Sequence, residues 1–127
     1  MPFDNPPQGP SSDLEILMDA RGMIDSPDRW LKGDFRKEDR HCLVAALALA
    51  CRNPEFDQPS GTERRLILAM ARQLPRGLGR LQRTICFGPR QRLMRFNDDP
   101  RKMHDDVMAL FDRTVQHLAS AHCYIIR

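Results

Sequence analysis

Arginine is the most distinctive chemical feature of this sequence, because it is concentrated in one segment. Residues 64–95 contain nine arginines and no lysine, aspartate or glutamate, whereas the whole chain has a net charge of only +3. A guanidinium group makes planar, two-point contacts with carboxylates and phosphates. The pattern predicts a non-enzymatic binding or regulatory module that contacts an acidic protein surface or nucleic acid. The predicted contact residues are Arg64, Arg65, Arg72, Arg76, Arg80, Arg83, Arg90, Arg92 and Arg95.

The same arginines have a second interpretation, as a solvated face whose charges are partly paired within the protein. Carboxylates for such pairs occur in the first and last predicted helices, at Asp13, Glu15, Asp19, Asp105, Asp106 and Asp112. The sequence has no helix-turn-helix or other motif for nucleic-acid recognition. Two aromatic residues near the arginines, Phe87 and Phe96, could stack on bases.

A second group of chemically capable residues surrounds the turn before the last predicted helix. Asn97 and Asp98 precede this helix and His104 follows them, and a histidine beside carboxylates can act as a general base. With Trp30, the only tryptophan, these residues define the alternative function: a small enzyme or ligand-binding domain with its site here. The structural interpretations are a helix cap for the Asn-Asp pair and a core or hinge anchor for Trp30. No phosphate-loop, dinucleotide or zinc-protease motif is present, so we predict no catalytic residue and no cofactor.

The cysteines and histidines predict no metal site. The dipeptide His-Cys occurs at residues 41–42 and 122–123, but zinc sites normally place two ligands two to four residues apart. Cys42 and Cys51 would point to opposite sides of a helix that turns about 100° per residue. We therefore expect both to be small, reduced core residues.

The helix that must position these side chains is predicted at residues 41–51. From Cys42 to Cys51 the chain has ten apolar residues without interruption. A helix with no polar face is typically buried, and this run is much shorter than the roughly 20 apolar residues that cross a bilayer. We expect it to be the centre of the fold and expect no membrane segment.

The predicted fold is all-α, an irregular bundle of four main helices with one or two short helices around residues 41–51. Helical periodicity and cap signals place the other elements at residues 12–25, 62–74, 76–85, 90–96 and 100–119, and no strand pattern is evident. We expect an extended proline-rich arm at residues 1–11, one helical domain at 12–119 and a tail at 120–127. The start of the chain resembles no export signal, which predicts a cytoplasmic protein of undetermined oligomeric state.

Three short motifs resemble a family of small bacterial proteins known only as a domain of unknown function. They are Trp30-x-x-Gly33, Cys42-x-x-Ala45-Ala46-Leu47, and Phe96-Asn97-Asp98 followed by His104. The resemblance covers residues 13–119, although this chain has Ala45 where the family commonly has glycine, and the arginine-rich segment is not part of the pattern. It implies a compact helical domain in the bacterial cytoplasm and assigns no catalytic or binding residue.

Overall fold

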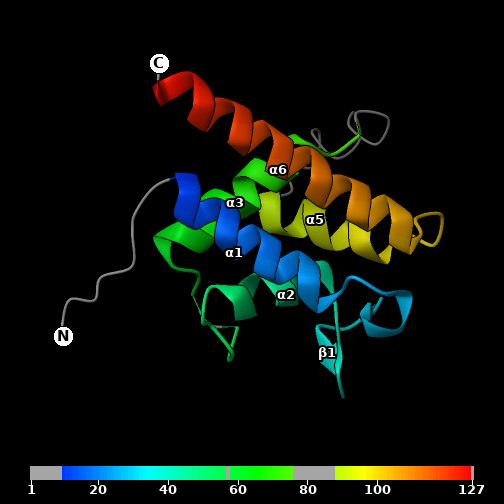
Figure 1. The fold of residues 1–127 in the computed structure, drawn as a ribbon. Helices are drawn as coiled ribbons and strands as arrows, with labels where there is room; N and C mark the ends of the chain where they lie inside the picture. Colours follow the sequence, from blue (N-terminus) through cyan, green and yellow to red (C-terminus); the bar gives the residue numbers. More distant parts are fainter. Residues whose placement is uncertain (1–9, 57, 76–87, 127) are drawn as a thin grey trace.

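The apolar run in the middle of the chain forms the buried centre of the fold. In the computed structural model, helix α2 (Leu43–Ala50) has eight residues, and its first six are completely buried. Cys42 is its N-cap and Cys51 its C-cap, so the central helix is slightly shorter than the predicted 41–51. The structure describes the backbone of residues 10–56, 58–75 and 88–126 (Figure 1).

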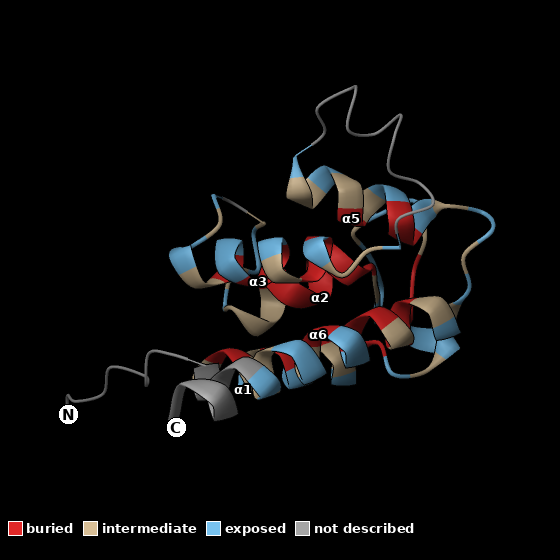
Figure 2. Cartoon of the chain, turned by 90° about the horizontal axis from the view of Figure 1, so that it is seen from above, coloured by how far each residue is buried: buried red, intermediate tan, exposed pale blue. Residues whose placement is uncertain are grey.

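Helices pack on both sides of α2. Helices α1 (Pro10–Met23) and α6 (His104–Ile126) pack against each other, and α3 (Gly61–Arg72) packs against α5 (Pro89–Asp98). Helix α2 contacts α1, α3 and α5, and Figure 2 shows its buried residues between the two helix pairs. The predicted all-α fold is therefore confirmed.

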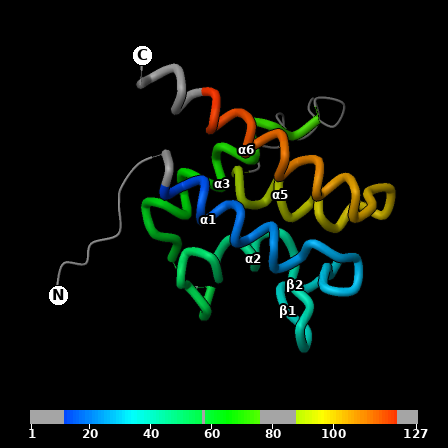
Figure 3. Tube along the Cα trace, in the orientation of Figure 1, coloured from blue at the N-terminus to red at the C-terminus, as the bar shows by residue number. Residues whose placement is uncertain are grey.

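A short irregular segment connects α1 to α2. It contains a 3-10 turn η1 (Pro27–Arg29) and a hairpin of β1 (Arg36–Lys37) and β2 (Arg40–His41). The strands are antiparallel, with Arg36 opposite His41, and the hairpin projects from one edge of the helices (Figure 3). The sequence did not predict this hairpin, because its strands are two residues long and polar.

Several helices begin or end at other residues than the sequence predicted. Helix α1 begins at Pro10, and α5 continues through Asp98, so Asn97 and Asp98 are helical rather than part of a turn. The predicted start of the last helix near residue 100 is wrong, because the Asp99 carboxylate accepts from the Arg101 N–H and shapes a separate turn. Helix α6 starts at His104 and extends to Ile126.

Parts of the sequence prediction lie outside the described residues. These are most of the extended arm, the helix predicted at residues 76–85, and the side chains of the last residues. None of the described helices combines the length and the apolar composition needed to cross a membrane.

Candidate functional site

The structure brings Trp30, Asn97, Asp98 and His104 together from three parts of the chain. The Trp30 indole N–H donates to Asn97 Oδ1 at 2.6 Å. The rings of Trp30 and His104 lie 5.9 Å apart, centroid to centroid, at a tilt of 55°. The segment after η1, the end of α5 and the start of α6 therefore meet at these residues.

Asn97 is completely buried, and its amide is fully used within the protein. Its Oδ1 also accepts from the Leu43 N–H at 3.1 Å, at the start of α2. Its Nδ2 donates to the Leu31 carbonyl at 2.9 Å and to Asp98 Oδ1 at 3.0 Å. An amide side chain has two donor hydrogens and two acceptor lone pairs, so none is left for a ligand. Asn97 joins three segments of the backbone and acts as a structural residue.

His104 also makes a structural contact. Its Nε2 lies 2.7 Å from the carbonyl oxygen of Ile24, just after α1. Because a carbonyl can only accept, Nε2 must carry the hydrogen and donate it. This bond holds the start of α6 against the end of α1 and leaves the lone pair of the neutral ring on Nδ1.

A cavity of about 120 Å³ lies beside this cluster. In the described part of the chain it is lined by Gly33, Asp34, Phe35, Cys42, Met94, Asn97 and Asp98. Sequence reasoning singled out Asn97 and Asp98 but missed the other five. Two of those five, Gly33 and Cys42, belong to the three short sequence motifs. Their presence in these motifs was the sequence signal that could have identified them as site residues.

Asp98 and Gly33 shape one wall of the cavity. The Asp98 Oδ1 accepts from the Gly33 N–H at 2.8 Å as well as from Asn97. Gly33 has φ of +83°, a conformation that residues with a side chain rarely adopt, and this brings its N–H to the carboxylate. The Asp98 side chain remains exposed at the cavity.

Phe35 also lines the cavity, and its ring is in contact with two other residues. Its ring stacks on Phe56 at 5.4 Å between centroids, and the Arg90 guanidinium carbon lies 5.4 Å from the Phe35 centroid. Arg90 is one helical turn before Met94 on α5, and Met94 itself lines the cavity. A positive charge therefore stands beside a cavity whose own charged lining residues are acidic.

Neither described cysteine has the properties of a nucleophile. Burial raises the pKa of the Cys42 thiol, and the nearby Asp98 charge raises it further. Burial also raises the pKa of the Cys51 thiol to about 12, with Glu63 and Asp13 adding to the effect. Reactive cysteines have lowered pKa values, because the thiolate is the nucleophile. The Cys42 sulfur accepts from the Ala45 N–H at the start of α2, whereas Cys51 caps the end of α2 through its backbone N–H. Both thiols are protonated structural groups.

The α3 arginines of the predicted face differ in their contacts. Arg65 makes an ion pair with Asp13, one of the carboxylates proposed for internal pairing, at 3.2 Å between Arg65 Nη2 and Asp13 Oδ1. Arg64 and Arg72 are exposed on α3, and the Nη2 of Arg64 donates to Gln58 at 3.4 Å.

The arginines of α5 differ in their burial, and part of the arginine-rich segment lies outside the described residues. Arg90 and Arg92 are half-buried, and the Nε atom of each is buried without a hydrogen-bond partner. Arg95 is exposed. Three further arginines of the predicted face, Arg76, Arg80 and Arg83, lie outside the described residues.

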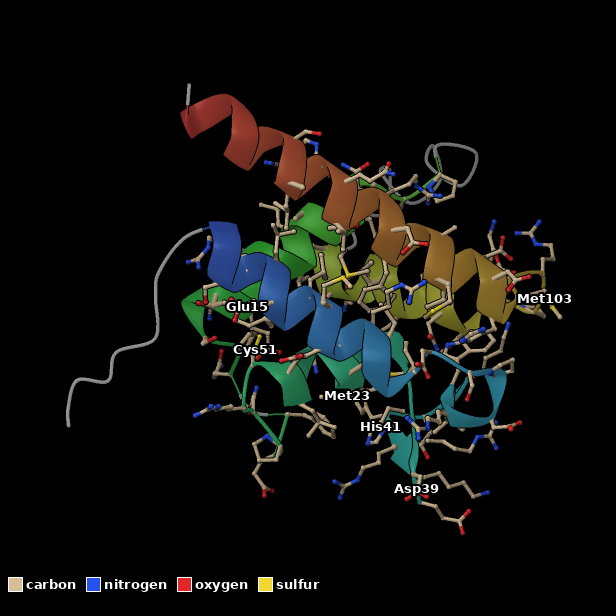
Figure 4. The ribbon with its side chains drawn as sticks, viewed as in Figure 1. Glu15, Met23, Asp39, His41, Cys51 and Met103 are labelled. Carbon is tan, nitrogen blue, oxygen red and sulfur yellow. The ribbon has the colours of Figure 1, made fainter. Side chains whose placement is uncertain are left out.

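Within the described residues, no group of three or more His, Cys, Asp and Glu side chains is placed to hold a metal ion. Figure 4 shows His41 on the hairpin and Cys51 in a separate part of the molecule, beneath α1. Burial and the charge of Arg36 lower the pKa of His41, which favours its neutral form. The side chains of His122 and Cys123, which would complete a Cys2His2 set, are outside the described residues.

Comparison with known proteins identifies the family. The sequence model of the Family of unknown function (DUF6197) matches residues 9–117. The chain belongs to this family. The match includes the cavity, the Asn97 cluster and the arginine-bearing helices, and it confirms the resemblance to a domain of unknown function. No curated protein and no solved structure matches the chain.

Proposed function

We propose that this protein is a binding module and that the outer side of α3 docks an acidic protein partner. The observation that carries the proposal is a stripe of three exposed residues, Arg64, Leu68 and Arg72, which we call the α3 stripe. They are four residues apart, so they lie one above another along the helix. Two guanidinium groups flanking an apolar side chain suit a partner surface with carboxylates around an apolar residue.

The neighbouring charges support the same partner. Helix α3 packs against α5, which carries the half-buried Arg90 and Arg92 and the exposed Arg95, so both helices of this pair bear positive residues. On α3, Arg65 is already neutralised by Asp13, whereas Arg72 forms no ion pair with any described carboxylate. A carboxylate from outside the chain would supply that missing partner.

A protein partner is favoured over nucleic acid by the aromatic residues. Phe96, one of the two rings predicted to stack on bases, is only 2% exposed and lies beneath the Lys102 ammonium group. Single-stranded nucleic acid is bound largely through exposed aromatic rings. Leu68, by contrast, is 37% exposed within the α3 stripe, and an apolar residue among arginines is typical of protein interfaces.

Fluorescence anisotropy with a labelled peptide that alternates glutamate and leucine tests this proposal. We expect Arg64→Glu with Arg72→Glu to weaken peptide binding about tenfold or more, a loss of about 1.4 kcal/mol or more. Leu68→Ala should also weaken binding. The matched control is Arg29→Glu with Lys37→Glu, which makes the same charge change at exposed positions away from α3.

Two results would contradict the proposal. One is equal loss of peptide binding in both double variants, which would mean that net charge alone drives the interaction. The other is tighter, strongly salt-dependent binding to mixed-sequence DNA or RNA, because phosphate contacts release counterions. The second result would assign the surface to nucleic acid.

A further inference from the structure

We propose that the cavity between Gly33–Phe35 and α5 binds a small zwitterion, a molecule of about five or six non-hydrogen atoms such as a free amino acid. This site is separate from the α3 stripe, so either proposal can fail without the other. The inference rests on the acidic groups of the cavity, on the cation beside it and on its size.

The acidic side of the cavity is suited to an ammonium group. Asp98 uses Oδ1 to accept from the Gly33 N–H, and Asp34 uses Oδ1 to accept from the Phe35 N–H at 2.9 Å. Among the hydrogen bonds of the described residues, none uses the Oδ2 of either carboxylate. Both oxygens therefore remain available at a cavity whose described lining includes no positive residue. An ammonium group with its three donors would satisfy this arrangement.

Arg90 supplies the opposite charge at the edge of the cavity. Its guanidinium carbon lies 5.4 Å from the centroid of Phe35, which lines the cavity. Arg90 also precedes Met94, another lining residue, by one turn of α5. The carboxylate of a ligand placed near Phe35 would be attracted by the charge of this guanidinium group.

The two charges together select the ligand class. A simple cation would be repelled by Arg90, and a simple anion would be repelled by Asp34 and Asp98. A zwitterion places each of its charges next to the opposite one. The cavity volume of about 120 Å³ is somewhat smaller than the roughly 150 Å³ of an engineered cavity that holds benzene, so it has room for a glycine- or alanine-sized molecule. Cys42 and Met94 give it weakly polar walls without further charge.

Titration of the ¹⁵N-labelled full chain with glycine and with β-alanine, followed by amide NMR spectra, tests the proposal. We expect saturable shifts at Gly33, Phe35 and Asp98 with a Kd on the order of 1 mM, typical of so small a ligand. Acetate alone and ethylammonium alone should bind at least about tenfold more weakly than either zwitterion.

Three variants test how much the Asp98 and Arg90 charges contribute to zwitterion binding. Asp98→Asn keeps an oxygen for the Gly33 N–H but removes the charge, and Arg90→Gln removes the cation. Each should weaken binding about tenfold, and their unchanged amide spectra outside the cavity would show that they fold. The matched control, Asp28→Asn, removes an exposed carboxylate on η1 and should bind like the parent protein.

Either of two outcomes overturns the proposal. The first is the absence of saturable shifts at cavity residues at about fifty times the expected Kd. The second is binding that neither Asp98→Asn nor Arg90→Gln weakens, or that acetate or ethylammonium reproduces in full, since a zwitterion site requires both charges.

Discussion

At the scale of single residues, Asn97 shows what a sequence pattern can and cannot indicate. The sequence marked it as a cap or as part of a pocket, and the structure places it beside Trp30, Asp98 and His104. Its role could not be predicted, because two of its partners, the Trp30 indole and the Leu43 N–H, are 67 and 54 residues away in the chain. A buried amide is defined by distant groups, and one sequence does not reveal which of them it meets.

We expect Asn97→Ala to lower the free energy of unfolding by about 2–4 kcal/mol. The reason is that the Trp30 indole N–H and the Leu43 N–H would remain buried without an acceptor, and each such donor costs about 1–3 kcal/mol. Urea denaturation followed by Trp30 fluorescence measures the change. Asp105→Ala, at an exposed position on α6, is the control and should change stability little. Equal stability of the two variants would contradict the role given to Asn97.

The Cys51 thiol predicts a specific loss of stability at high pH. Its pKa is raised from 9.0 to about 12 in the folded protein, so the folded state holds the thiol proton more tightly than the unfolded state does. This contribution is complete below pH 9 and is lost as the pH rises from 9 towards 12. Urea denaturation across this range, under reducing conditions, should show a steeper decline for the parent protein than for Cys51→Ala. Parallel declines would show that Cys51 ionises normally.

At the scale of secondary-structure elements, local signals were sufficient for some features and insufficient for others. The apolar run predicted α2, and local cap signals predicted α3, whose N-cap Ser60 accepts from the Glu63 N–H at 3.2 Å. Both depend on residues within one or two helical turns. The hairpin depends instead on Trp30, which bridges to His41, and on backbone bonds to Leu31 and Cys42. Its four strand residues, Arg36, Lys37, Arg40 and His41, have no apolar alternation to reveal it.

The turn of this hairpin gives a prediction at the same scale. Glu38 has φ of +57°, a left-handed conformation that costs a non-glycine residue about 1–2 kcal/mol. We expect Glu38→Gly to raise the free energy of unfolding by about 0.5–1 kcal/mol, because glycine adopts this conformation without strain. Thermal unfolding followed by circular dichroism measures the change. Asp39→Gly, next to it but with no positive φ, should instead lower stability, and a similar effect of both substitutions would contradict this explanation.

At the scale of the whole molecule, the two helix pairs share one core and are joined at its edge by Trp30. The buried apolar cluster includes residues of α1, α2, α3, α5 and α6. Trp30 is part of this cluster and also contacts Asn97 on α5, His104 on α6 and His41 on β2. The cavity lies next to this junction, so a ligand bound there would contact the segment before α2 and the end of α5 at once. Its binding should therefore stabilise the whole fold rather than one loop.

This arrangement predicts that the protein unfolds in a single cooperative step. Trp30 fluorescence reports on the junction and far-UV circular dichroism reports on all helices, so their urea transitions should coincide in midpoint and slope. His104→Ala, which removes the contact between the start of α6 and the Ile24 carbonyl, should shift both transitions to lower urea together. If Trp30 lost its native fluorescence at lower urea than the helices unfolded, the junction would be a separate, weaker unit. A ligand in the adjacent cavity would then order that unit locally, and the stability of the helices would not change on binding.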